Sequence, residues 1–316
     1  MKKYNKTIKW ILQVAVTGLL LYFTLQKLEA GKLKEILSGI SLWMILPVMV
    51  FLFFDMIINS YRILALYRFY GVKAKLLNIC LVKFHGFFFS LFFPLLGDAY
   101  KIQAFKTKYG ASYGKNSVVV LLDRLIYTFA LTVILVPIWI LNIIEINIVF
   151  KIVIVALFFL EISVLVLLNK PNIINKIILL PGRIHNKLSL SGYNFERKRK
   201  YSIEIAKNTL VAIIRHVFIA LLYFLIAYTV MPEISFNVVL FILIVFSIML
   251  SRVIPVSVGG IGLREYIAVI IFPQIGIAEE YAFTIAFIMS SIMIIQGILG
   301  GFSFLITRLI KPVKTI

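Results

Sequence analysis

The sequence predicts an all-α polytopic membrane protein with about eight transmembrane helices plus a re-entrant segment, and three observations carry that prediction. Hydrophobic residues make up 62% of the 316 residues and charged residues only 15%, too little charge to cover a soluble fold. Apolar runs of about 18 residues or more, each long enough to cross a bilayer, recur along the chain. Basic residues gather mainly between those runs, as in cytoplasmic loops.

The expected helices follow the apolar runs in order. They are residues 8–25, 42–60, 84–96, 117–141, 148–168, 209–230, 235–251, 262–275 and 281–306. The first run is long for a signal peptide and has no clear cleavage site, so we expect it to be retained. We expect residues 1–316 to form a single transmembrane domain, with a cytoplasmic loop at about 170–208.

The charges between the runs set the expected orientation. The lysines that precede the first run place the N-terminus in the cytoplasm. If the short run 84–96 crossed the bilayer, the four lysines between residues 101 and 115 would lie outside, against the positive-inside rule. If it enters and returns, both termini are cytoplasmic. The outer turns are then 143–146, 232–234 and 277–280. Only the loop with Lys27, Lys32 and Lys34 fits poorly, because it lies outside.

The net charge of +20 would suggest nucleic acid on a soluble protein. Here topology and attraction to anionic lipid headgroups explain it, so we expect membrane lipids and no nucleic acid as partners. The single cysteine, Cys80, forms no internal disulfide and has no metal-ligand neighbours in sequence. No Walker loop, dinucleotide fingerprint or triad order appears, so no metal, cofactor or catalytic residue is predicted.

Two interrupted segments, FFPLLGDAYK (92–101) and SRVIPVSVGGIGLRE (251–265), break the helical pattern within apolar surroundings. Proline removes a backbone donor, and glycine permits positive φ. Paired interruptions of this kind point to a transporter's binding site, although two ordinary interfacial turns remain the alternative. The candidate substrate-binding residues are Pro94, Gly97, Asp98 and Lys101 in the first segment and Arg252, Pro255, Gly259, Gly260, Gly262, Arg264 and Glu265 in the second.

Charged residues inside apolar runs are the second indication of a site. Asp123, Arg124 and Arg215 lie roughly two turns, about 10 Å, from the cytoplasmic end of their runs. Charge in hydrocarbon is costly, so these side chains should face the bundle interior or water. The arginines could instead reach the interface by snorkelling, whereas the short Asp123 side chain cannot.

Together these patterns predict one cavity that opens to the cytoplasm and binds an anionic headgroup. Arg124, Arg252 and Arg264 would line it, held in place by Asp98, Asp123 and Glu265. We expect Arg264 to lie near water at the start of a helix whose positive end faces a phosphate. Asp55, Asn59 and Arg62 share one helix face. The Gly297–Gly301 stretch is read as a helix-packing surface rather than a site.

The quoted motifs resemble a known family. PLLGDAYK (94–101), YGASYGKNSVVVLLDR (109–124) and VIPVSVGGIGLRE (253–265) are similar to the lysylphosphatidylglycerol synthase transmembrane-region family. Its members include the membrane half of the bacterial multipeptide-resistance factor and stand-alone flippase-like proteins. Leu96 stands where members often have glycine. The resemblance implies transfer of a lipid or lipid-linked intermediate between leaflets of the cell membrane, and a link to antibiotic resistance.

Three functions remain open at this stage. The first is translocation of an anionic or aminoacylated phospholipid. The second is a membrane transferase of the phosphatidylglycerol lysyltransferase type, with Asp98, Asp123 or Glu265 as acid or base. In the longer relatives a separate soluble domain makes the aminoacyl-lipid, so we expect this chain alone to make none. The third is a partner subunit of a separate synthase. A homo-oligomer is also left open.

Overall fold

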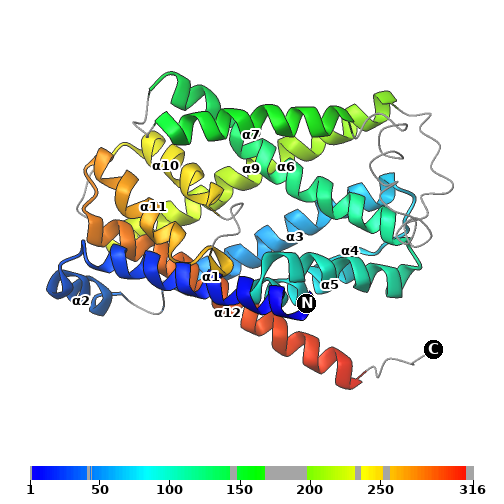
Figure 1. Cartoon of the computed structure of the whole chain (residues 1–316), viewed down its shortest axis with the longest axis horizontal. Coiled ribbons are helices and arrows are strands. Elements are labelled where there is room, and N and C mark those ends of the chain that lie inside the picture. The colour runs from blue at the N-terminus through cyan, green and yellow to red at the C-terminus, as the bar shows by residue number, and fades with distance from the viewer. Residues whose placement is uncertain are drawn as a thin grey trace. The chain divides into compact units, whose positions relative to one another are not determined.

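The computed structural model describes residues 2–40, 43, 45–142, 148–167, 198–231, 236–251 and 257–310, and these form helices and turns without strands (Figure 1). The helices of the first half are α1 (Lys2–Leu25), α2 (Ala30–Ser38), α3 (Ile45–Phe69), α4 (Leu76–Phe92), α5 (Pro94–Tyr109) and α6 (Tyr113–Ile140). Those that follow are α7 (Ile148–Leu167), α9 (Lys198–Val230), α10 (Val238–Leu250), α11 (Leu263–Ile271) and α12 (Glu279–Ile310). Short 3₁₀ turns, η2 (Val258–Gly260) and η3 (Phe272–Ile275), flank α11.

The predicted all-α class is therefore confirmed for the described residues. Within the described part of the chain, four helical stretches are long and apolar enough to cross a bilayer: Leu46–Phe69, Tyr113–Ile140, Tyr201–Val230 and Glu279–Ile310. α11 is a shorter element than the expected run 262–275, because its nine residues span only about 14 Å. The predicted outer turns 143–146 and 232–234, and most of the loop 170–208, lie outside the described residues.

α9 begins before the apolar run that predicted it. Its first residue is Lys198, not 209, so the end of the expected loop 170–208 is helical. Tyr201 is buried in this added part, and Asn208 donates a 2.8 Å hydrogen bond to Glu204 one turn earlier. Polar residues that pack or pair at i, i+4 extend a helix beyond its apolar stretch.

α4 and α5 form a hairpin that turns at Phe93. Pro94 begins α5, where its missing N–H and fixed φ are tolerated. A methyl group on Gly97 would collide with the Ser90 side chain and lie 2.6 Å from the Gly86 carbonyl oxygen, so α5 returns along α4 at close range. The chain reverses direction here, as predicted for 84–96, but the two arms are 17 and 16 residues long.

α12 packs against α4 through its glycines. Added methyl groups at Gly297, Gly300 and Gly301 would meet Leu91, the Phe84 backbone and the Phe88 ring respectively. Small residues let helix backbones approach closely in membranes. The predicted packing role of this stretch is thus confirmed.

The described chain falls into two compact units, which we treat separately. Unit 1 comprises residues 1–55, 84–97 and 217–316, and unit 2 comprises 56–83 and 98–216. The boundaries lie inside α3, α4, α5 and α9, so neither unit is one continuous stretch. In unit 1 the core includes Phe241 and Phe272, whose ring centroids lie 5.1 Å apart. In unit 2 it includes Tyr67 and Leu122.

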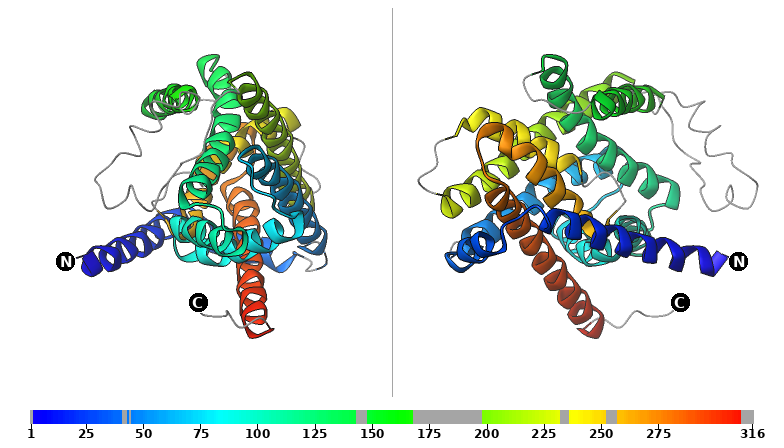
Figure 2. Two further views of the ribbon diagram at one scale, coloured as in Figure 1. Left: turned by 90° about the vertical axis from the view of Figure 1, so that its right-hand side faces the viewer. Right: turned by 60° about the vertical axis from the view of Figure 1, so that its left-hand side comes forward.

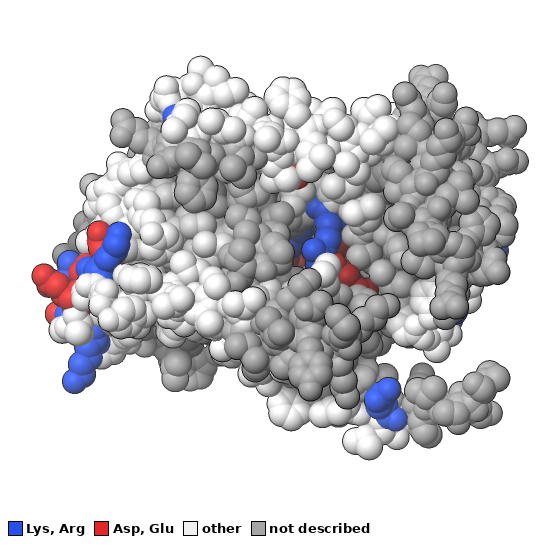
Figure 3. Space-filling model, in the orientation of Figure 1, with Lys and Arg blue, Asp and Glu red and all other residues white. Residues whose placement is uncertain are grey.

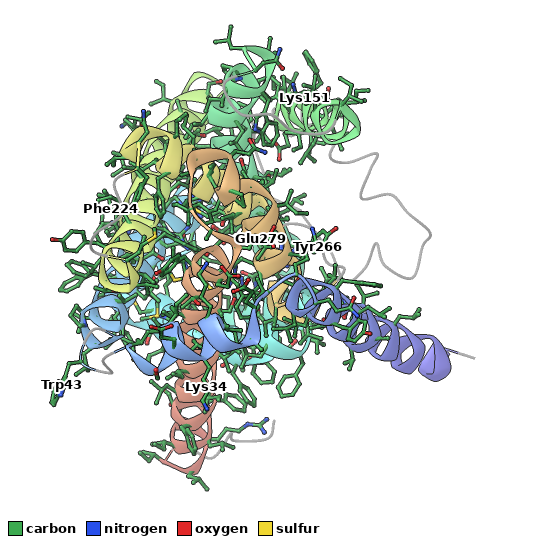
Figure 4. All side chains as sticks on the ribbon, turned by 90° about the vertical axis from the view of Figure 1, so that its left-hand side faces the viewer. Lys34, Trp43, Lys151, Phe224, Tyr266 and Glu279 are labelled. Carbon is green, nitrogen blue, oxygen red and sulfur yellow. The ribbon has the colours of Figure 1, made fainter. Side chains whose placement is uncertain are left out.

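The short helix α2 was not expected from the apolar runs. It belongs to unit 1, and Lys32 forms a 2.9 Å ion pair with Glu280 in the first turn of α12. Acidic and basic side chains gather over α2 at the left end of Figure 3. Trp43, which follows α2, is 80% exposed and points away from the helices in Figure 4. The hydrogen bond to Glu280 raises the pKa of the Lys32 ammonium above its ordinary value.

Candidate functional site

The first interrupted segment supplies a cluster of charges in unit 2. Asp98 lies one turn into α5 and accepts from two cations. Lys101 pairs with it at 2.7 Å from the next turn of the same helix, and the Arg124 Nε pairs with its other oxygen from α6. Arg124 remains 43% exposed, whereas Asp98 is nearly buried. The carboxylate is thus neutralised inside the protein while one cation still reaches solvent or headgroups.

Asp123, the neighbour of Arg124 on α6, makes a second ion pair, which is more buried than the first. It pairs with Nη2 of Arg62 on α3, and the same nitrogen donates a 2.9 Å hydrogen bond to Asn59. Asn59 and Arg62 are both buried, as their predicted common helix face requires, and so is Asp55. Two adjacent residues of α6 therefore tie this helix to α3 and to α5 through opposite charges.

A small cavity adjoins this ion pair. Lys83, Lys101 and Asp123 line it together with Tyr67, and its volume is about 10 Å³. A volume near 10–15 Å³ holds one water molecule. The Tyr67 hydroxyl is buried without a hydrogen-bond partner among the described residues, so a water here would have polar groups to bind. This cavity is too small for a lipid headgroup.

Arg215 also lies in unit 2, against α6. Its guanidinium lies 5.7 Å from the ring centroid of Tyr127, one turn beyond Asp123, and both Arg215 and its neighbour His216 are buried. His216 Nε2 lies 3.0 Å from the Tyr127 carbonyl oxygen. Arg215 is therefore packed inside the protein, whereas a snorkelling arginine would extend to the interface.

The second interrupted segment builds a tight turn in unit 1. Gly260 and Gly262 have φ of 83° and 82°, values that side chains disfavour. A methyl group on Gly262 would lie 3.0 Å from the Thr17 carbonyl oxygen of α1. The Thr17 hydroxyl accepts a 2.9 Å hydrogen bond from the Val258 N–H. The glycines thus serve a turn that packs directly on α1, and Gly259 lies within η2.

Arg264 and Glu265 follow this turn and are fully buried, at 1% and 0% exposure. Glu265 accepts a 2.6 Å hydrogen bond from the Gly262 N–H, which caps the start of α11. Ser290 of α12 joins the two charges: it accepts from Arg264 Nη1 at 2.6 Å and donates to Glu265. Arg264 Nε and Nη2 have no hydrogen-bond partner among the described residues.

Two expectations about this segment are wrong. Arg264 does not lie near water, because α1, α12 and the turn exclude it. The positive end of α11 does not face an open phosphate site, because the Glu265 carboxylate occupies it. Arg252 and Pro255 lie outside the described residues. Arg124 belongs to unit 2 and Arg264 to unit 1, so the single shared cavity stays a prediction.

Sequence reasoning missed two residues that complete these contacts. Ser290 bridges Arg264 and Glu265 from 25 and 26 positions away, and Thr17 binds Val258 from 241 positions away. Each is a small hydroxyl residue in an apolar run, which is a weak signal because a hydroxyl can also bond to its own helix. Thr17 does this too, donating to the Gln13 carbonyl at 2.7 Å.

The clusters can attract anions and hold them by charge. Arg124 is the accessible cation of the ion-pair cluster in unit 2, whereas Arg264 is buried in unit 1. Among the described residues, no group of three or more His, Cys, Asp or Glu could hold a metal ion.

Comparison with known families agrees with the motifs. The family described as the lysylphosphatidylglycerol synthase TM region matches residues 10–301. No curated protein and no solved structure matches the chain. Because the family match spans almost all of the sequence, and because the described residues form long apolar helices, this membrane protein belongs to the lysylphosphatidylglycerol synthase transmembrane-region family.

Proposed function

We propose that this protein moves an anionic or aminoacylated phospholipid, or a lipid-linked intermediate, between the leaflets of the cell membrane. The observation that carries the proposal is the ion-pair cluster of unit 2. Arg62, Asp123 and Arg124 lie on α3 and α6, which are long and apolar enough to cross a bilayer, and Asp98 of α5 pairs with Arg124. Charges in membrane helices are costly and generally mark a substrate or ion pathway.

Arg124 is the residue that we place in contact with the headgroup. It is held by Asp98 and yet is 43% exposed, so a lipid phosphate can reach its free edge. Arginine binds phosphate through two parallel hydrogen bonds. Arg264 is fully buried in unit 1, so we assign it no contact with the headgroup.

Leaflet exchange in proteoliposomes tests the function. The purified chain is reconstituted with fluorescent phosphatidylglycerol, lysyl-phosphatidylglycerol or phosphatidylcholine, and accessibility to a membrane-impermeant quencher is followed. We expect faster exchange for the first two lipids than in protein-free vesicles, and slower exchange with Arg124→Ala. Equal rates with and without protein for every lipid would reject translocation.

The topology is part of the proposal. We propose eight crossings, a re-entrant α4–α5 hairpin and both termini in the cytoplasm. With Cys80 replaced, single cysteines at positions 110 and 278 can be labelled in intact cells by an impermeant maleimide. Position 278 should react from outside, and position 110 only after permeabilisation. Labelling of position 110 from outside would contradict the re-entrant hairpin.

The transferase alternative is tested separately. The family match is to the transmembrane region of the synthase, so we expect the purified chain to make no lysyl-lipid from lysyl-tRNA and phosphatidylglycerol. Product above a protein-free control would favour the enzyme. Exchange that appears only when a synthase is co-expressed would favour a partner subunit.

A further inference from the structure

A groove in unit 2 lies apart from the ion-pair cluster. Five residues of α3 and one of α9 line it, and its volume is about 260 Å³. The lining residues are Tyr61, Leu64, Ala65, Arg68, Phe69 and Glu204. The end of α3 and the beginning of α9, which contribute these residues, can be followed in Figure 2.

The groove is a preformed feature of the packing between these helices. The rings of Phe69 and Tyr201 lie 6.0 Å apart between α3 and α9, and Tyr201 is buried. Glu204 is held by the 2.8 Å hydrogen bond from Asn208. The α3 residues recur at i, i+3, i+4, i+7 and i+8, so one helix face forms the wall.

Two opposite charges face this groove without pairing. Arg68 forms no hydrogen bond or ion pair with the other described residues, and Glu204 is not within ion-pair distance of it. A guanidinium and a carboxylate that share a groove yet stay apart leave room for a ligand with both charges. Arginine suits a phosphate, and a carboxylate suits an ammonium group. The exposed Tyr61 ring can add a cation–π contact to the ammonium.

An apolar stripe leads away from the groove along α3. Ile57 and Ile58 are exposed and lie one turn before Tyr61 on the same face. Both belong to the stretch Leu46–Phe69, which is long and apolar enough to cross a bilayer. A ligand that fits both regions has a charged head and an apolar tail. Arg68 lies one residue before the end of this stretch, and a helix that crosses the bilayer over this length brings its end to headgroup level.

We propose that this groove binds one phospholipid whose headgroup carries both a phosphate and an ammonium group. The phosphate lies on Arg68, the ammonium lies between Glu204 and Tyr61, and an acyl chain follows Ile57 and Ile58. The proposal does not depend on translocation, because a lipid can bind here in a protein that moves none.

Native mass spectrometry of the full chain in detergent tests the proposal. The probe is an equimolar mixture of phosphatidylethanolamine and phosphatidylglycerol with identical acyl chains, which differ in the ammonium group. Glu204→Gln should lower the bound ratio of phosphatidylethanolamine to phosphatidylglycerol about two- to fivefold, the range of a partly exposed ion pair. Arg68→Gln should lower the binding of both lipids by a similar factor and leave their ratio unchanged.

Matched controls separate the groove from general charge. Lys34→Gln and Glu35→Gln on the exposed helix α2 make the same charge changes elsewhere and should alter neither amount nor ratio. Melting temperatures of all variants show whether folding is intact; a variant that fails is replaced by Arg68→Lys or Glu204→Asp, for which we expect the same change with smaller size. An unchanged ratio in folded Glu204→Gln would overturn the proposal.

Water-soluble phosphoethanolamine distinguishes a lipid from a free metabolite. We expect it to compete with phosphatidylethanolamine only at far higher concentration, because it lacks the acyl chain that covers Ile57 and Ile58. Competition at equal concentration would overturn the lipid assignment. Binding that is insensitive to Arg68→Gln, as when part of this chain fills the groove, would also overturn it. Leaflet exchange by the same variants is measured in parallel. A loss of binding without a loss of exchange supports the site and separates it from translocation, whereas unchanged binding overturns the site whatever the exchange rate.

Discussion

The two interrupted segments contain the same residue types, yet the structure uses them in opposite ways. In the first, Asp98 sits between two cations, one of which is 43% exposed. In the second, Arg264 and Glu265 are sealed in the protein around Ser290. A proline, a glycine, an acid and a base therefore do not define a role. Whether a charged side chain is exposed to solvent depends on how distant helices pack around it. α1 and α12 cover the second segment.

The largest expected effect is at the buried second segment. Glu265→Ala removes the cap of α11 and strands the buried Arg264 charge, so we expect the free energy of unfolding to fall by about 3–5 kcal/mol. Arg264→Ala should be comparably destabilising. Melting temperature and expressed yield measure both. The control is Glu279→Ala, which removes a glutamate from another helix start. A melting temperature like wild type for Glu265→Ala would remove the distinction between the segments.

Asp123 should come next. Asp123→Ala strands Arg62, but Asp123 is partly exposed, so we expect the low end of the same range, about 3 kcal/mol. The double variant Arg62→Met with Asp123→Leu removes both charges, and apolar replacement of a buried pair is often neutral. It should therefore be more stable than Asp123→Ala alone. If the double variant is the less stable one, the ion pair itself contributes net stability.

Substitution of Arg124 should affect lipid exchange much more than stability. Arg124→Ala leaves Asp98 paired with Lys101, so the free energy of unfolding should change by less than about 1 kcal/mol. Lipid exchange should nevertheless fall well below wild type. Arg124→Lys should restore exchange only in part, because lysine offers no planar fork to phosphate. Full exchange by both variants would support a snorkelling arginine with no substrate role.

The smallest effect is expected at the ion pair between Lys32 of α2, which is 40% exposed, and the buried Glu280. The Glu280 hydrogen bond raises the pKa of Lys32, so its stabilisation is complete below the unfolded value of 10.5 and is lost as pH rises past the higher folded value. Lys32→Met should lower stability by less than about 1 kcal/mol. The difference in melting temperature from wild type should stay constant between pH about 7 and 9. A difference that shrinks within that window would assign the contact to another group.

The helices that could be predicted from the sequence were those formed by long apolar runs. Long runs identified α3, α6 and α12, and the lysines between residues 101 and 115 pointed to a chain reversal near α4 and α5, because basic loops favour the cytoplasmic side. α2 was missed because its nine residues are half polar and its contacts are to α12, which is distant in sequence. The start of α9 was missed because its first turns are polar.

The site was predictable in its charges but not in its burial. Costly residues such as Asp123 and Arg264 stand out in any apolar run. Their exposure depends on helices from elsewhere in the chain, and sequence spacing does not predict which distant helices pack against them. Ser290 shows this clearly, since one hydroxyl 26 residues away decides how Arg264 is held.

The contact between Thr17 and Val258 has a consequence for how the protein is made. The two residues are 241 positions apart, and the turn that α1 packs against is completed only by Gly262. At about 5–20 residues per second, α1 is synthesised on the order of 10–50 seconds before its partner exists. Throughout that interval the surface of α1 that contacts this turn is not yet covered by it. An insertion factor that shelters early helices would therefore act mainly on α1, and truncations before residue 262 should leave that helix as a target for membrane proteases.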